Sequence, residues 1–107
     1  MELLEQCTFL VEKINDTRQS IIDNVVNTIK KHNVEEIYCN YLTYTPLLIK
    51  SMTLDSISLT DKNEIKLWCS DEDENDYVFA DELDIELLIG FYQWFIDYED
   101  ELFEQDY

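Results

Sequence analysis

The 107-residue chain has very few of several residue types on which many functional sites depend. It has a single glycine, Gly90, a single proline, Pro46, and a single histidine, His32. One glycine excludes a glycine-rich phosphate-binding loop, because such a loop needs several residues without a Cβ near the phosphate. His32 lies at a predicted helix end and is expected to cap it or to lie on the surface. Paired carboxylates remain as acid–base candidates, but the sequence defines no pocket for them, so we expect no enzyme and no cofactor.

Cysteines and long apolar runs are also scarce. Cys7, Cys39 and Cys69 lie about thirty positions apart, so none of them has the paired spacing that holds zinc, and their number is odd for disulfides. We expect reduced thiols in the core. No run approaches the roughly 18 apolar residues of a membrane span, and the first residues lack the basic start and apolar run of a signal peptide. The expectation is a soluble, cytoplasmic protein with no membrane partner.

Basic residues are few: seven Lys and Arg face 25 Asp and Glu, which gives a net charge of −18. The excess is uneven, since residues 1–53 hold seven acids and five bases whereas residues 54–107 hold eighteen acids and two bases. Such a surface repels nucleic acid and anionic membranes and attracts basic proteins. Acidity also favours solubility, but an even spread of acids would do that equally well. We therefore predict no direct nucleic-acid binding and a basic protein partner.

Hydrophobic residues make up 46% of the chain and aromatics 13%, enough to predict one folded domain over residues 1–107. Apolar residues recur at spacings of three and four from Leu3 to Ile29, which predicts one long helix. Arg18 interrupts this stripe and residues 15–17 suit a cap, so two helices joined at a kink are the alternative. An unbroken helix would be about 45 Å long, which exceeds the width of a small domain. Covering a sheet is its simplest role, and packing against a second copy or a partner is the other.

β-branched and aromatic residues follow the helix and favour extended structure. The strands are expected at residues 37–44, 49–60, 64–70 and 77–80. Turn-forming residues at 61–63 and the acidic run 71–76 join the last three strands, which predicts an antiparallel meander of three to four strands. The expected fold class is α+β.

A second helix is predicted after Asp84, a good N-cap, and it is expected to pack on the sheet. Its apolar residues form two adjacent stripes, one of which could instead be an exposed aromatic patch. Gly90 inside it suggests a close approach or a shallow bend. Acids over residues 97–107 are unfavourable at a helix C-terminus, so the last few residues are expected to fray.

The stretch "DEDENDYVFADE", residues 71–82, partly matches the twelve-residue calcium loop of an EF-hand. The matching ligand positions are Asp71, Asp73, Asn75 and Glu82. Position 6 of the loop is Asp76, where the sharp turn favours glycine, and the preceding segment has strand periodicity where an EF-hand has a helix. We therefore expect no metal site.

The remaining interpretation treats the carboxylates as a binding surface. Duplex DNA presents a dense row of phosphates, and DNA-binding proteins meet it with Lys and Arg, so a rigid protein with Asp and Glu at similar density can occupy the same groove. Aromatics among the acids would add short-range contacts. The predicted partner-binding acids are Asp71, Glu72, Asp73, Glu74, Asp76, Asp97, Glu99, Asp100, Glu101 and Glu104. The predicted aromatic anchors are Tyr77, Trp94 and Tyr98.

In its size, its acidity and its lack of catalytic motifs, the chain is similar to the small DNA-mimic inhibitors of phages and mobile elements, such as anti-restriction and anti-CRISPR proteins. The resemblance implies an inhibitor that blocks a basic nucleic-acid-binding site. Two alternatives stay open. One is an immunity protein or antitoxin that neutralises a basic toxin, and the other is a scaffold that forms a homodimer through the first helix.

Overall fold

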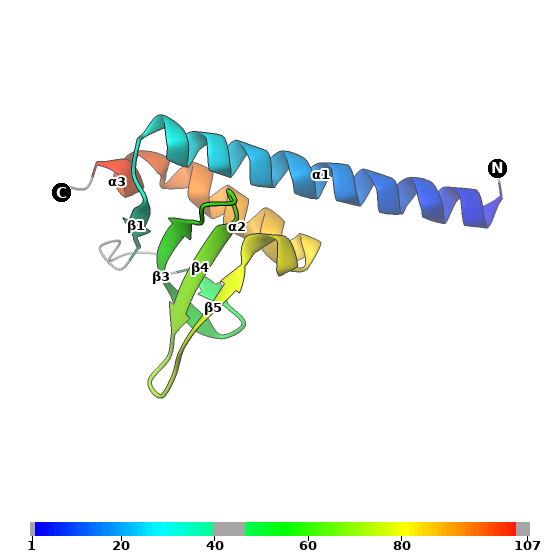
Figure 1. Cartoon of the computed structure of the whole chain (residues 1–107). Coiled ribbons are helices and arrows are strands. Elements are labelled where there is room, and N and C mark those ends of the chain that lie inside the picture. The colour runs from blue at the N-terminus through cyan, green and yellow to red at the C-terminus, as the bar shows by residue number, and fades with distance from the viewer. Residues whose placement is uncertain (1, 40–46, 105–107) are drawn as a thin grey trace.

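The computed structural model describes residues 2–39 and 47–104. The chain forms an N-terminal helix, an antiparallel sheet and C-terminal helices (Figure 1), which confirms the predicted α+β fold. In chain order the elements are α1 (Leu3–Lys31), β1 (Glu36–Tyr38), β2 (Leu48–Ile49), β3 (Met52–Leu59), β4 (Ile65–Ser70), β5 (Asn75–Phe79), the 3-10 helix η1 (Ala80–Glu82), α2 (Ile85–Asp97) and α3 (Glu99–Phe103).

Helix α1 is continuous, so the alternative of two helices joined at a kink is wrong. Arg18 does not end the helix, because its guanidinium forms hydrogen bonds with the segment that leads into α2. Its Nη1 donates hydrogen bonds to the backbone carbonyls of Asp81, at 3.1 Å, and Leu83. The helix ends at His32 and the left-handed Asn33, whose φ is 56°. The basic Lys30 and Lys31 in its last turn complement the negative end of the helix dipole.

The sheet has the order β1-β3-β4-β5, and β2 also pairs with β3. Strands β3, β4 and β5 form the predicted meander. Strands β1 and β2 lie end to end along the other edge of β3, with Ile37 opposite Ile57 and Leu48 opposite Thr53. The sheet therefore has five strands where three to four were expected.

The last strand begins at Asn75, two residues earlier than predicted, and two other predicted strands differ more from the structure. The strand expected over residues 49–60 is divided, because Lys50 and Ser51 have φ of 52° and 70° and form a two-residue turn between β2 and β3. The strand expected over residues 37–44 is extended only as β1 in the part described, and residues 40–44, like Pro46, lie outside the described residues.

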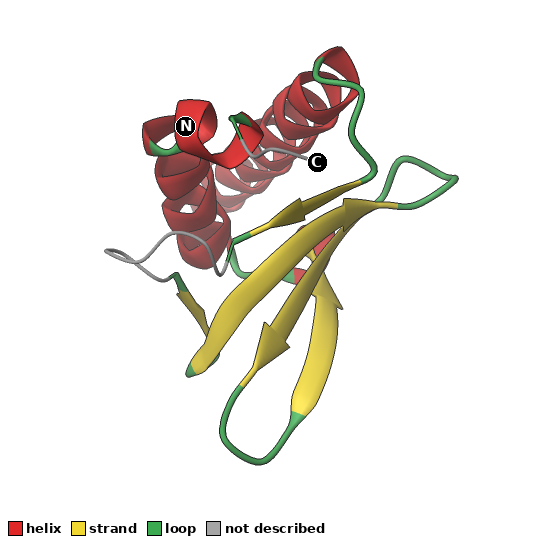
Figure 2. Cartoon of the chain, turned by 90° about the vertical axis from the view of Figure 1, so that its left-hand side faces the viewer, coloured by secondary structure: helices red, strands yellow, loops and turns green. Residues whose placement is uncertain are grey.

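Both α1 and α2 lie on one side of the sheet (Figure 2), and a single core fills the space between the layers. Alternate residues of β4 point into this core, namely Ile65, Leu67 and Cys69. The facing helical side chains are Ile21, Val25 and Ile29 of α1 and Leu88, Phe91 and Phe95 of α2. Burying each large apolar side chain contributes roughly 1.5–3 kcal/mol, so this core is the main source of stability.

The N-terminal half of α1 takes no part in the core. Every residue from Glu2 to Thr17 is exposed, and these residues are called the arm below. The arm projects away from the rest of the molecule (Figure 1). With the arm included, the principal extents are 54 × 34 × 26 Å. The expectation that the first helix covers the sheet therefore holds only for its C-terminal half, where the buried residues run from Ile21 to Ile29.

Candidate acidic binding surface

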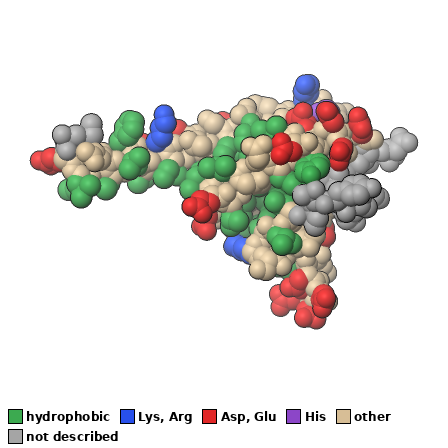
Figure 3. All heavy atoms as spheres, turned by 180° about the vertical axis from the view of Figure 1, so that it is seen from behind, with side chains coloured by type: hydrophobic (Ala, Val, Ile, Leu, Met, Phe, Trp, Pro, Cys, Tyr) green, Lys and Arg blue, Asp and Glu red, His purple; other side chains and the backbone are tan. Residues whose placement is uncertain are grey.

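The fold separates the predicted partner-binding acids into two groups. Five of them, Asp71 to Glu74 and Asp76, lie at the tip of the β4–β5 hairpin, and all five are exposed. The others lie at the end of α2 and in or just after α3, beside the C-terminal end of α1, where His32 stacks on Phe103 with ring centroids 3.9 Å apart. Figure 3 shows acidic side chains gathered at both places.

The hairpin tip, defined as residues 71–76, has a turn that its own hydrogen bonds fix. The backbone N–H of Asp71 donates to the carbonyl of Glu74 at 2.9 Å. The carboxylate of Asp71 accepts the backbone N–H groups of Asp73 and Glu74 at 2.8 and 2.7 Å. This is the Asx-turn that Asp favours in short loops. Asp71 thus holds the turn, while Glu72, Asp73 and Glu74 carry exposed charge.

Two aromatic residues stand beside the tip on the face of the sheet away from the helices. Trp68 and Tyr77 are directly opposite in the β4–β5 register, with ring centroids 5.3 Å apart, and they are 37% and 47% exposed. The indole Nε1 of Trp68 donates to Ser58 Oγ at 3.0 Å. The ammonium of Lys66 lies 4.4 Å from the Trp68 ring and 4.0 Å from the Tyr77 ring. These contacts fix the pair in place.

Of the three predicted aromatic anchors, only Tyr77 lies at this surface. Trp94 is 7% exposed and belongs to the core, where a partner cannot reach it, and Tyr98 is half-buried at the end of α2. Trp68 was missing from the sequence prediction. Its place on the polar side of the alternating segment, between Lys66 and Ser70, was the signal that could have found it.

A surface depression of about 360 Å³ adjoins Trp68 and the tip. Its lining includes the acidic residues Glu36, Asp55 and Asp76 together with the indole of Trp68. The register of β3 shifts between Leu54 and Ser56, which makes Asp55 the extra residue of a β-bulge. Carboxylates beside an aromatic ring suit a guanidinium or ammonium group, which can form charge-assisted hydrogen bonds and a cation–π contact.

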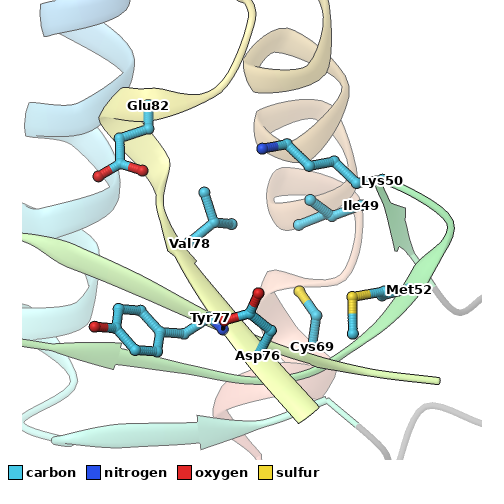
Figure 4. Close-up of a pocket in the computed structure, with 8 residues that line it drawn as sticks. All are labelled: Ile49, Lys50, Met52, Cys69, Asp76, Tyr77, Val78 and Glu82. Atoms are coloured by element: carbon cyan, nitrogen blue, oxygen red, sulfur yellow. Dashed lines mark hydrogen bonds between the residues drawn. The ribbon is translucent and has the colours of Figure 1, made fainter. Parts of the chain in front are cut away.

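A smaller pocket, of about 150 Å³, lies on the other side of the hairpin (Figure 4). Met52, Cys69 and Val78 line it, with Lys50 and Glu82 at its rim. Sites for small molecules usually measure roughly 300–1,000 Å³, so this pocket is too small for an ordinary substrate.

The four residues of the calcium-loop match lie in three different elements. Asp71 and Asp73 lie in the turn, Asn75 begins β5, and Glu82 lies in η1, beyond the far end of that strand. Over residues 2–39 and 47–104 there is no cluster of three or more His, Cys, Asp or Glu residues placed to hold a metal ion. In the same part of the chain no helix combines the length and the apolar character needed to cross a membrane.

The three cysteines differ sharply in their surroundings. Cys7 is exposed on the arm, whereas Cys39 and Cys69 are buried. Burial, followed by the nearby carboxylate of Asp55, raises the pKa of the Cys39 thiol to about 12 and that of Cys69 to about 11. Because the unfolded chain loses these protons from about pH 9, the two thiols lower the free energy of unfolding only as the pH rises above that value.

A thiol titration tests this assignment. In dilute native protein at neutral pH, Ellman's reagent is expected to modify one of the three cysteines promptly, and the Cys7→Ser variant is expected to lose that reaction. All three cysteines should react after denaturation. Prompt modification of two or three thiols in the native wild-type protein would contradict the burial of Cys39 and Cys69.

Comparison with models of known protein families, with curated proteins and with solved structures finds no match to this chain. The molecule is an α+β protein with an acidic hairpin tip and a projecting helical arm. Its function is therefore argued from the chemistry of these surfaces.

Proposed function

We propose that the protein is a non-catalytic inhibitor that binds a basic, nucleic-acid-binding protein and blocks its nucleic-acid site as a DNA mimic. One observation carries the proposal. Four of the acids of the hairpin tip are exposed together on a turn that hydrogen bonds hold in shape, and the fifth, Asp76, follows in β5, next to the exposed Trp68 and Tyr77. A turn that is already ordered favours binding, because no free energy is lost in ordering its carboxylates when the partner binds.

The field around the tip supports association with a basic surface. Residues 54–107 hold eighteen acids and only two bases, Lys62 and Lys66. The ammonium of Lys66 lies over the rings of Trp68 and Tyr77, on the side of the sheet away from the helices. Because acids far outnumber bases in residues 54–107, this half of the chain attracts a basic partner at long range and speeds their encounter. Salt weakens this attraction.

Short-range contacts follow from the depression beside Trp68. A Lys or Arg side chain of the partner enters it, with its charge against the carboxylate of Asp55 and its stem against the indole. A DNA-binding surface offers such side chains in number, because phosphate contacts require them. The second acidic group, at α3, adds to the field and extends the acidic surface.

The test is a charge reversal that spares the turn. The double variant Glu72→Lys with Glu74→Lys changes two exposed acids and leaves Asp71, which holds the turn, intact. The control is Glu12→Lys with Asp16→Lys, which gives the same net charge from two exposed positions on the arm. Tagged forms are used to capture proteins from cell extracts and are eluted with a salt gradient. The dissociation constant of the captured partner and its inhibition on duplex DNA are then measured.

The tip variant is expected to weaken partner binding about 10- to 100-fold and to lose inhibition, whereas the control changes affinity by less than about threefold. A partner that binds both variants equally would contradict the role of the tip. Recovery of partners that do not bind nucleic acid would contradict the mimic itself.

A further inference from the structure

The arm carries an apolar seam that the rest of the chain leaves uncovered. Leu4, Cys7, Val11 and Ile14 follow one another at spacings of three, four and three, which are the a and d positions of a heptad repeat. The same register continues into the buried half of α1 at Ile21 and Val25. Arg18 holds the intervening position of this register. The stripe is covered by the core on one side of Arg18 and exposed on the other, and Figure 3 shows apolar side chains along the arm.

The exposure along this seam is large. Leu4 is 77% exposed, Val11 57% and Ile14 41%, and the neighbouring Leu3 and Leu10 are 74% and 58% exposed. An isolated helix of about 15 residues is marginal in water, because its stability normally comes from packing of its apolar face. An apolar stripe on an otherwise solvated helix marks an interaction surface.

We infer that the arm is a self-association element, and that two copies of the chain pack their arms side by side in antiparallel orientation. A heptad seam needs a partner helix with the same repeat, and a second copy supplies one. The residues that flank the seam, Leu3, Thr8, Leu10, Asn15 and Thr17, are all uncharged, so two copies place no like charges against each other. This inference is independent of the proposed function.

Charge also argues against the basic partner as the occupant of the arm. The acids Glu5, Glu12 and Asp16 lie on the side of α1 opposite the seam, as the helical period requires. A basic protein would therefore meet apolar and neutral polar side chains at the seam, and no carboxylate beside them. The arm, with its uncharged seam, is suited to a copy of itself, whereas the hairpin tip is suited to a cation.

The antiparallel direction follows from where the charge lies. Each copy carries eighteen acids and two bases in residues 54–107, and those within residues 54–104 all lie in the body from which the arm projects. Parallel arms would hold the two bodies side by side. Antiparallel arms place them at opposite ends of a paired segment about 22 Å long, which exceeds the Debye length of about 8 Å at physiological salt. In that arrangement Leu4 packs beside Ile14 of the second copy, and Cys7 beside Val11.

Sedimentation equilibrium from about 1 to 200 µM tests the association. The wild type is expected to form a dimer, and Val11→Glu is expected to raise its dissociation constant at least about 100-fold, because each dimer would bury two unpaired charges. Phe9→Glu is the matched control, since Phe9 is 62% exposed on the side of the helix away from the seam and its change should leave the dimer intact. Unchanged circular dichroism of the body checks that both variants fold.

A wild type that stays monomeric up to the highest concentration overturns the inference, as does equal dissociation of the Phe9 and Val11 variants. Oxidative cross-linking tests direction. Parallel arms bring the two copies of Cys7 together, whereas antiparallel arms separate them by more than the roughly 7 Å that a disulfide can span. The wild type is therefore expected to give no disulfide-linked dimer, and Val11→Cys, which retains Cys7, is expected to give one. A disulfide-linked wild-type dimer overturns the antiparallel arrangement.

Discussion

Replacing Phe91 by alanine is expected to lower the free energy of unfolding by about 3–5 kcal/mol. Phe91 is 1% exposed near the middle of α2, and its ring centroid is 6.0 Å from that of Phe95. Removing the ring loses its transfer free energy and leaves a cavity that α1, α2 and the sheet can fill only in part. Because domains of this size are stable by only about 5–15 kcal/mol, the variant should be close to unfolding at physiological temperature.

The matched control is Ile96→Ala on the same helix. Ile96 is 50% exposed, so its truncation is expected to change the free energy of unfolding by less than about 1 kcal/mol. Urea titrations followed by circular dichroism give both values, with equal m-values as the check that the unfolded states are comparable. Equal losses for the two variants would mean that α2 buries a different face.

Helix α2 also shows where sequence reasoning reached its limit. Its existence and start were predictable from Asp84 and the apolar spacing, and helix α1 was predictable from its period and its lack of glycine and proline. The buried face of α2 was not predictable, because two apolar stripes lie side by side. The structure buries Leu88 from one stripe and Phe91 from the other, while Ile89 of the first is 49% exposed.

The turn at Lys50 and Ser51 shows a second limit. Neither residue is one of the usual choices for positive φ, so nothing in the local sequence separated β2 from β3. The two-residue turn is formed because Leu48 and Ile49 pair with Thr53 and Met52 on β3. Long-range pairing thus decided a conformation that propensity alone would have made extended.

The acidic residues of the candidate site could be predicted individually, but their grouping could not. Charge is visible in composition, whereas the distance between the residues near 72 and those near 100 depends on the hairpin and on α2, whose 13 residues span about 20 Å. Among the aromatics, Trp94 was predicted as a binding anchor but is 7% exposed in the core, whereas Trp68, which was not predicted as an anchor, is 37% exposed beside the hairpin tip. The alternation of residues 64–70 placed Trp68 on the polar face, but only the packed structure shows that Trp94 is covered.

Arg18 is the second position where a single substitution should have a large effect. Its guanidinium links α1 to the carbonyls of Asp81 and Leu83, the turn by which the chain passes from the sheet to α2. The variant Arg18→Met keeps most of the side-chain stem and removes the donors. The expected loss in the free energy of unfolding is about 1.5–3 kcal/mol, the range for hydrogen bonds to a charged group.

The control for Arg18 is Lys13→Met, which removes one positive charge from an exposed position on the arm and should change stability by less than about 0.5 kcal/mol. Urea titrations of both variants in the Val11→Glu background keep self-association out of the comparison. The carbonyl of Leu83 matters most, because Leu83 is 1% exposed and its backbone has little access to water once the guanidinium is removed. A stability of Arg18→Met equal to that of Lys13→Met would mean that water replaces the guanidinium at both carbonyls. Arg18 would then contribute nothing measurable to stability. The expected loss in the free energy of unfolding would instead show that Arg18 stabilises the contact between α1 and the segment before α2.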